Sequence, residues 1–521
     1  MTQLQPLTQS FRPPRAWPWW TLLVLLCTLI SAIHYLEKEP ATALPDPARI
    51  DSPILKLYGR YLMGASNLMN WASSGGAGAP PASAPTFSQS ADALDALDDA
   101  APTIIEKIRV VPIAAELVGT DAAIQRLDSI DSQLSAEPAL DEAFRRDAAA
   151  LRAIYTGHPD TLEQPQRDEL AARHHWFARL ALSFGKPDSD PERQSFAAEA
   201  NRAMLGIIAL AILFLTAGVA GFVLFIIAAV LIGAGRIRPA LAAASPQTTP
   251  IPLAASNAFL ESFVLFLAAF LVASGVALVA HALTGLDLSF VLLCIVPVLA
   301  LWPMSRGLSW TQLRDDLGWR RGKGIVREIA AGITGYLAGI PIIILGVVLS
   351  VLIITLSGTD ATHPIVNELS SGGPLAIIVL FLMATVWAPL VEETFFRGAL
   401  YAHLRGRPVP PSPDSITRAE QPAGLFARDS ATPAASTPSQ QAESAHSAGR
   451  RRALTVIPAA LITGFVFAAI HPQGIGAVPV LTALGFNFSL LREWRGSLIA
   501  PMTAHAIHNG VATIVLILFL A

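Results

Sequence analysis

Repeated long apolar runs are the strongest constraint on how this chain of 521 residues can fold. A helix needs about 20 apolar residues to cross roughly 30 Å of hydrocarbon. A spanning segment must also satisfy its own backbone groups, because lipid offers no hydrogen-bond partners. Runs near or above this length lie at about 18–36, 203–234, 256–284, 288–304, 325–356, 374–391, 453–470, 475–490 and 498–520. The sequence therefore predicts an all-α polytopic membrane protein with about nine transmembrane helices.

The overall composition fits this class. Hydrophobic residues make up 53% of the chain and charged residues only 14%, which is too apolar for an ordinary soluble protein. The net charge is -3 and no basic patch is concentrated anywhere, so we expect no nucleic-acid partner. The expected surroundings are a lipid bilayer, and the expected location is a bacterial cytoplasmic (inner) membrane.

The distribution of Lys and Arg gives an expected orientation. Arg12 and Arg15 precede the first apolar run, whereas the short loop 357–372 contains no Lys or Arg. Cytoplasmic loops are enriched in these residues, so the N-terminus is expected inside the cytoplasm. Residues 37–202 would then form an extracytoplasmic segment.

The first apolar run has two interpretations. Ala41-Thr42-Ala43 follows it, which is compatible with a cleaved signal peptide. The apolar stretch is longer than a usual signal core and is followed directly by the charged residues 37–39. We therefore favour an uncleaved N-terminal anchor at residues 1–36.

Changes in composition divide the rest of the chain. The predicted parts are the extracytoplasmic segment 37–202, accessory transmembrane helices in 203–320 and a C-terminal core in 321–521. Within the first part, a Gly/Ala/Pro/Ser-rich stretch at 74–91 predicts a flexible linker, and helical spacing of apolar residues predicts a helical domain at 94–200. A Pro/Ser-rich stretch at 406–450 predicts a disordered insertion in the core.

The predicted helical domain contains three histidines, His158, His174 and His175, without a metal-binding motif. Adjacent histidines point about 100° apart on a helix, so joint metal ligation by His174 and His175 is not expected. We expect these histidines at the surface. The domain at 94–200 would select or dock an extracytoplasmic partner.

Three short polar clusters interrupt the apolar C-terminal helices. They are Glu392 to Arg397 (Glu-Glu-Thr-Phe-Phe-Arg), Phe467 to His471 and His505 to Asn509. Ionisable groups in hydrocarbon are costly unless they face protein or water, so they indicate a functional site. Together they supply the carboxylates, imidazoles and amide that can activate water and stabilise an oxyanion. We expect the three clusters to share one cavity, although counting loops places His471 at the far end of its run.

Spacing within the clusters indicates separate tasks. Glu393 and Arg397 are four residues apart with the acid first, which favours an ion pair. Glu392 points about 100° away from Glu393 and is the candidate general base. His505 and Asn509 share one face of the last helix and are expected to donate hydrogen bonds toward a common oxyanion.

In this order, the clusters resemble the CPBP family of CAAX prenyl endopeptidases and bacteriocin-processing enzymes. The family pattern is Glu-Glu-x-x-x-Arg, then Phe-x-x-x-His, then His-x-x-x-Asn/Asp. The resemblance implies an intramembrane endopeptidase that hydrolyses membrane protein or peptide substrates, without showing any prenyl requirement. It implies catalytic roles for Glu392, Glu393, Arg397, His471, His505 and Asn509.

Two mechanisms are compatible with these residues. In one, Glu392 and His471 polarise a water while His505 and Asn509 stabilise the oxyanion without a cofactor. In the other, His471, His505 and Glu392 bind Zn²⁺, as in catalytic sites with two histidines and one glutamate. We favour the metal-free mechanism.

Two other classes of function remain as alternatives. A membrane transporter also uses buried Glu, Arg and His residues, but no internal repeat is visible and the polar clusters are confined to the C-terminal half. A catalytically idle family member would act as a membrane scaffold.

Overall fold

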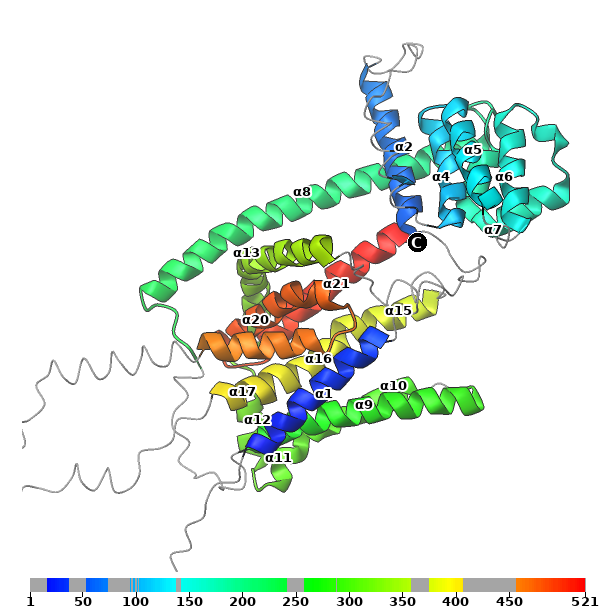
Figure 1. Ribbon diagram of the computed structural model, residues 1–521. Coiled ribbons are helices and arrows are strands. Elements are labelled where there is room, and N and C mark those ends of the chain that lie inside the picture. Colours follow the sequence, from blue (N-terminus) through cyan, green and yellow to red (C-terminus); the bar gives the residue numbers. More distant parts are fainter. Residues whose placement is uncertain are drawn as a thin grey trace, which may run out of the picture. The chain divides into compact units, whose positions relative to one another are not determined.

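The computed structural model describes most of the chain as helices (Figure 1). The described residues are 16–36, 53–73, 94, 97–98, 101, 103–136, 142–240, 257–286, 288–357, 374–405 and 456–520. Within these ranges there is no strand, which confirms the predicted all-α class. The predicted linker at 74–91 and the predicted insertion at 406–450 lie outside them.

The chain forms two compact units. The first, here called the membrane unit, draws on the described residues of Met1–Lys38, Ala217–Pro364 and Pro374–Thr513. The second, here called the helical unit, is mainly formed by the described residues of Glu39–Thr216.

Six helical segments are long and apolar enough to cross a membrane, which makes the chain an integral membrane protein. These segments are Trp17–His34 within α1 (Trp17–Leu36), α8 (Pro191–Gly233), α9 (Ala258–Thr284), α13 (Ile325–Ser357), Leu375–Arg405 and Ile475–Arg495. A seventh is obtained if Ser289–Ser305 and Trp310–Leu317, which meet at 119°, form one broken span. The helix Val456–Ala469 is shorter than a full span. The count of nine spans stays a prediction.

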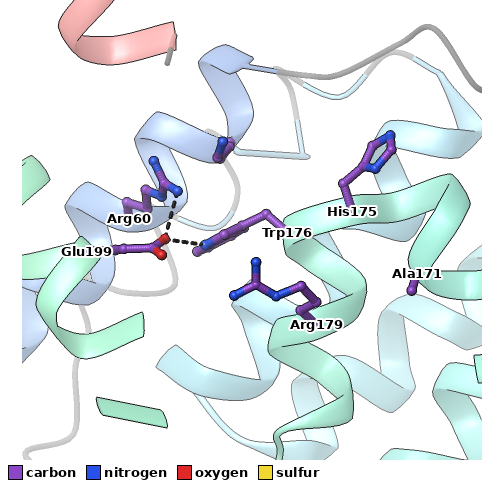
Figure 2. Close-up of a pocket in the computed structure, with 7 residues that line it drawn as sticks. Arg60, Ala171, His175, Trp176, Arg179 and Glu199 are labelled. Atoms are coloured by element: carbon purple, nitrogen blue, oxygen red, sulfur yellow. Dashed lines mark hydrogen bonds and ion pairs between the residues drawn. The ribbon is translucent and has the colours of Figure 1, made fainter. Parts of the chain in front are cut away.

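The helical unit is a bundle with two apolar clusters. It contains α2 (Pro53–Ser73), α4 (Ile104–Leu117), α5 (Thr120–Ala136), α6 (Glu142–Tyr155), η1 (Pro159–Thr161), α7 (Gln164–Leu182) and the start of α8. One cluster is formed by α4, α5, α6 and α7, and the other by α2, α4, α7 and α8. At the second cluster, Glu199 of α8 accepts hydrogen bonds from Arg60 of α2 and Trp176 of α7 (Figure 2).

His174 of α7 is buried, so its predicted surface position is wrong. Its Nε2 lies 3.0 Å from Oδ2 of Asp147 on α6, and Arg173 donates to the same carboxylate at 2.8 Å. The helix is kinked at the next residue, His175, whose φ is 44° and ψ is -112°. The buried carboxylate of Asp147 provides the polar partner that allows a histidine inside this bundle.

A row of glycines on α13 controls the packing of the membrane unit. A Cβ atom on Gly335, Gly339 or Gly346 would lie 2.1, 2.2 or 2.7 Å from side-chain atoms of α20 (Val478–Arg495). The two helices can approach this closely only because these positions lack side chains. Small residues serve the same purpose in other membrane helix pairs, where close van der Waals contact replaces the hydrophobic effect.

Short helices complete the membrane unit. They are α10 (Ser289–Ile295), η3 (Val296–Leu301), α11 (Trp302–Ser305), α12 (Trp310–Leu317), α15 (Pro374–Leu382), η4 (Met383–Trp387), α16 (Ala388–Glu393), η5 (Thr394–Leu400), α17 (Tyr401–Arg405) and η6 (Ile475–Ala477), followed after α20 by the longer α21 (Ile499–Leu520). The segments η4 and η5 are π-helical. Phe266 of α9 stacks on Phe395 of η5 at 3.9 Å between ring centroids, which fixes this stretch against α9.

Candidate active site

Glu392 and Glu393 end α16, between the π-helical segments η4 and η5. π-Helical segments are rare in proteins, and those that do occur are often found at functional sites. The sequence explains the π-helical form of η4, because Pro389 has no backbone N–H to donate to the carbonyl of Ala384. The N–H of Ala388 is already used by the carbonyl of Met383. The side chain that satisfies Ala384 comes from another helix.

Asn509 of α21 donates from Nδ2 to the carbonyl oxygen of Ala384 at 2.8 Å. This N–H therefore bonds to the backbone and does not point, together with His505, toward an oxyanion as predicted. The bond attaches α21 to η4, and the amide nitrogen carries a second hydrogen. His508, three residues after His505, faces a different neighbour and lies 3.2 Å from the hydroxyl of Tyr336.

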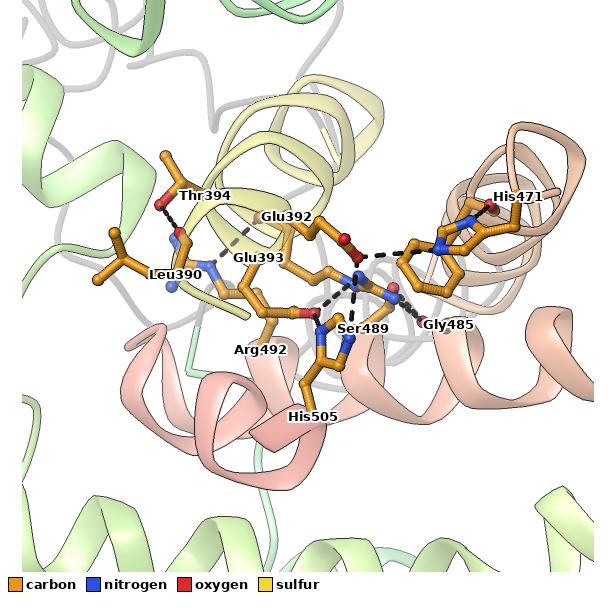
Figure 3. A network of polar contacts seen from close by, with 11 residues as sticks. Leu390, Glu392, Glu393, Thr394, His471, Gly485, Ser489, Arg492 and His505 are labelled. Carbon is orange, nitrogen blue, oxygen red and sulfur yellow. Dashed lines mark hydrogen bonds and ion pairs between the residues drawn. The ribbon is translucent and has the colours of Figure 1, made fainter. Parts of the chain in front are cut away.

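Glu393, Arg397 and His505 form a buried network, in which Figure 3 labels Glu393 and His505. Arg397 donates to Oε1 of Glu393 at 2.8 Å, which confirms the predicted ion pair, and to the carbonyl of Gly485 at 3.0 Å. Nδ1 of His505 lies 2.8 Å from the same Glu393 oxygen. An ionised carboxylate only accepts hydrogen bonds, so Nδ1 carries the proton. Nε2 of His505 is consequently the ring nitrogen that is directed at the rest of the site.

Aromatic rings enclose the Arg397 guanidinium. Its central carbon lies 4.9 Å from the ring of Phe467, 5.2 Å from Phe488 and 5.7 Å from Phe396. Ring faces attract a cation, which helps to compensate for its loss of water. Phe488 also stacks on His505 at 5.0 Å. Phe488 was not among the predicted site residues, and its one signal in the sequence is its place three residues after Gly485 on the same helix face.

A close helix crossing places His471. Helix Val456–Ala469 crosses α20 where Gly464 meets Gly485, and a Cβ on Gly485 would lie 2.6 Å from the Cα of Gly464. His471 follows directly, with Nδ1 donating to the carbonyl of Phe467. Its Nε2 is therefore left without a proton in the neutral ring. The crossing brings His471 to the first cluster, which loop counting did not predict.

Glu392 lies between the two histidines. Its Oε2 is 4.0 Å from Nε2 of His471 and 3.7 Å from Nε2 of His505. This oxygen is buried without a hydrogen-bond partner, although the side chain as a whole is 25% exposed. Figure 3 shows Glu392 of α16, His505 of α21 and His471, which follows helix Val456–Ala469, approaching one another. A water oxygen about 2.8 Å from each atom fits these separations.

The same three atoms are poorly spaced for zinc. Donors bound at about 2.0–2.2 Å in a tetrahedral site lie roughly 3.3–3.6 Å apart, whereas the separations from Glu392 are 3.7 and 4.0 Å. Among the residues that the structure describes, no group of three His, Cys, Asp or Glu side chains has a metal-binding arrangement. Binding of Zn²⁺ by His471, His505 and Glu392 would require these side chains to move closer together than the structure places them.

Comparison with known proteins locates the family resemblance in this site. Residues 374–511 match the family model of the type II CAAX prenyl endopeptidase Rce1-like proteins. The matched range includes all six predicted site residues. Neither the curated proteins nor the solved structures gave a match to this chain. The C-terminal part of this integral membrane protein, residues 374–511, is thus similar to the type II CAAX prenyl endopeptidase Rce1-like proteins, which supports a place in the CPBP family of membrane peptidases.

Proposed function

We propose that the protein is an intramembrane endopeptidase that cleaves membrane-associated protein or peptide substrates with a water activated by Glu392 and His471. The observation that carries this proposal is the approach of His471 and His505 to Glu392 at 4.0 and 3.7 Å. The three side chains come from separate segments, which are α16, α21 and the bend after helix Val456–Ala469. Burial of polar groups in an apolar unit is costly without a compensating use.

In the proposed reaction, Glu392 removes a proton from water while Nε2 of His471 accepts the second water hydrogen and orients the oxygen. The oxygen attacks the carbonyl carbon of the scissile bond. Protonated His505 donates from Nε2 to the resulting oxyanion. When the C–N bond breaks, the proton held by Glu392 passes to the leaving amine.

Glu393 and Arg397 act as positioning residues in this proposal. Glu393 accepts the Nδ1 hydrogen of His505 at 2.8 Å and thereby holds the ring with Nε2 directed at the oxyanion. Arg397 holds Glu393 and the backbone of Gly485. The second hydrogen of the Asn509 amide would donate to the oxyanion beside the N–H of His505.

The proposed topology has nine spans, a cytoplasmic N-terminus and residues 37–202 outside the cytoplasm of a bacterial inner membrane. The asymmetry of Lys and Arg supports it. A reporter that is active only outside the cytoplasm should work when inserted in 75–80 and stay silent in 410–445. The opposite result would overturn the orientation.

The proposed activity is tested with purified protein in detergent and a peptide library. Glu392→Gln should lower turnover by about a hundredfold, the scale of a lost general base, with an unchanged thermal midpoint. Glu169→Gln, an exposed acid on α7, is the matched control and should keep full activity. Full turnover in folded Glu392→Gln would remove the assignment and favour a transporter or scaffold instead.

A further inference from the structure

A basic cavity in the helical unit is lined by none of the residues that the proposed peptidase uses. Its volume is about 320 Å³, and α2, α7 and α8 contribute its walls (Figure 2). The lining includes Lys56 and Arg60 of α2, His175, Trp176 and Arg179 of α7, and Glu199 of α8. This volume falls within the range of small-molecule sites.

The charge of the cavity favours an anion. Three Lys or Arg side chains line it against a single carboxylate. That carboxylate, Glu199, already accepts from Nη2 of Arg60 at 2.7 Å and from Nε1 of Trp176 at 2.9 Å. Arg179 lies 3.7 Å from Glu192 and is half exposed. The forked guanidinium of arginine matches the oxygens of a phosphate.

Two local features indicate that the cavity is prepared for a ligand. Nε of Arg60 is a buried donor without a hydrogen-bond partner. His175, on the cavity wall, is the non-glycine residue with a positive φ, at 44°, in the part of the chain that the structure describes. Residues other than glycine rarely adopt this backbone conformation, and those that do are often found at ligand-binding positions.

The sequence of α8 places the cavity near a membrane surface. Arg202 is the last charged residue before the uninterrupted apolar stretch, and Leu205 begins a series of exposed apolar side chains. Glu199 precedes Leu205 by about 9 Å along the helix axis at 1.5 Å per residue. The headgroup layer on each side of the hydrocarbon is roughly 5–8 Å thick. The wall of the cavity that Glu199 forms therefore lies at the outer edge of the headgroup layer.

Helix α2 is consistent with the same depth. It crosses α8 at Gly64, where a Cβ would lie 2.8 Å from Cβ of Met204, at the beginning of the apolar stretch. Beyond the crossing, α2 exposes Leu68, Met69 and Trp71. Exposed apolar and aromatic residues next to basic ones are typical of helices that lie in the membrane interface.

We propose that this cavity binds the phosphate of an anionic phospholipid headgroup, held by Arg60 and Arg179 beside the indole of Trp176. The ligand comes from the leaflet into which the apolar stretch of α8 inserts. The site goes beyond the proposed peptidase function and does not depend on it.

The experiment titrates the purified full-length protein with short-chain phosphatidylglycerol or phosphatidylcholine and counts bound lipids by native mass spectrometry. Wild type should bind phosphatidylglycerol about tenfold more tightly than phosphatidylcholine, whose choline cancels the charge. Arg179→Gln should weaken phosphatidylglycerol binding about tenfold, the scale of a lost charge-assisted contact. Arg179→Lys should retain part of the preference. Because Arg179 is half exposed, both variants should keep the wild-type thermal midpoint.

Arg146→Gln is the matched control, because Arg146 is an exposed arginine of α6 outside the cavity lining. It should bind phosphatidylglycerol like wild type. Equal weakening by Arg146→Gln, or unchanged binding by folded Arg179→Gln, would overturn the proposal. Displacement of phosphatidylglycerol by inorganic phosphate at equal concentration would assign the cavity to a soluble phosphate and overturn the lipid source.

Discussion

The amide of Asn509 donates to the carbonyl of Ala384 at 2.8 Å, in place of the backbone donor that Pro389 lacks. A proline on one helix and an asparagine on another are thus two halves of one structural feature. The residue that family resemblance assigns to an oxyanion also closes the hydrogen bonding of the π-helical segment before the two glutamates. Stability and turnover at Asn509 can be separated by mutating its partner.

Asn509→Ala should lower the free energy of unfolding by about 1–3 kcal/mol, because it leaves the partly buried carbonyl of Ala384 without a donor. In a Pro389→Ala background a backbone N–H becomes available, so the same substitution should cost less. A double-mutant cycle of unfolding in detergent measures this coupling. Additive effects of the two substitutions would contradict the proposed relationship.

The two neighbouring glutamates should respond differently to removal of charge. Glu393→Gln should destabilise the membrane unit by roughly 3–5 kcal/mol, because it leaves Arg397 as a buried cation without its carboxylate. Glu392→Gln should unfold like wild type, since Glu392 is partly exposed and has no cation partner of this kind. Thermal unfolding of both variants in one detergent compares them. Equal loss of stability would show that the division of tasks is wrong.

Filling the crossing beneath His471 should impair the site indirectly. A Cβ on Gly464 would lie 2.6 Å from the carbonyl oxygen of Thr482, so Gly464→Ala must separate its helix from α20. We expect turnover to fall at least about tenfold as His471 moves away from Glu392, since small misplacements at a catalytic site have large effects on rate. Gly218→Ala on α8 is the matched control, because nothing lies within 4 Å of its added Cβ. A similar loss in both variants would indicate a general effect of alanine rather than the crossing.

The helical unit should lose stability as the pH falls. Burial lowers the pKa of His174 from its ordinary 6.5, in spite of the neighbouring Asp147. Burial by itself raises the pKa of Asp147, but hydrogen bonds from His174 and Arg173 outweigh it and hold that pKa below 3.8. In both cases the unfolded chain binds protons more readily, so stability is lost first below pH 6.5 and again below pH 3.8.

Hydrogen exchange of the full-length protein across α6 and α7 measures this loss. His174→Gln should remove the part of the pH dependence that begins below pH 6.5 and reduce the part below pH 3.8, because His174 also supplies one of the hydrogen bonds to Asp147. Exchange that is independent of pH in this range, after correction for its chemical rate, would contradict the assignment.

Chelation of metal ions should leave peptide hydrolysis unchanged. The separations of 3.7 and 4.0 Å between Glu392 and the two imidazoles suit a bridging water better than a common zinc ligand sphere. Activity is measured before and after treatment with EDTA or phenanthroline, with a zinc peptidase as the positive control. Loss on chelation and recovery with Zn²⁺ would favour the alternative mechanism.

Much of the site could be predicted because its chemistry is costly in lipid. Glu392, Arg397, His471 and His505 are conspicuous in apolar runs, and the structure brings them together. The bond from Asn509 to Ala384 could not be predicted, because it depends on how a proline distorts a distant helix. Gly464 and Gly485 are ordinary residues in sequence, and their meaning appears only where two helices touch.

His174 was mispredicted for a related physical reason. Its partner Asp147 lies 27 positions earlier on another helix, and no local pattern relates the two. The number of spans was harder to predict than their helical character, since Val456–Ala469 and the bent pair around residue 305 are apolar but short or broken. Hydrophobic content indicates burial in lipid or protein, and it does not separate the two.

The contacts across the site should allow the chain to be divided between Arg405 and Val456. Arg405, on one side of residues 406–455, forms an ion pair with Glu493 at 2.7 Å between Nε and Oε2. The ring centroids of Phe396 and Phe467 lie 5.2 Å apart. These contacts join the helices on the two sides of residues 406–455 and hold Glu392 near His471. Two separately expressed fragments divided between Arg405 and Val456 should therefore reassociate in the bilayer into a working enzyme, which would make its activity controllable by supplying one half.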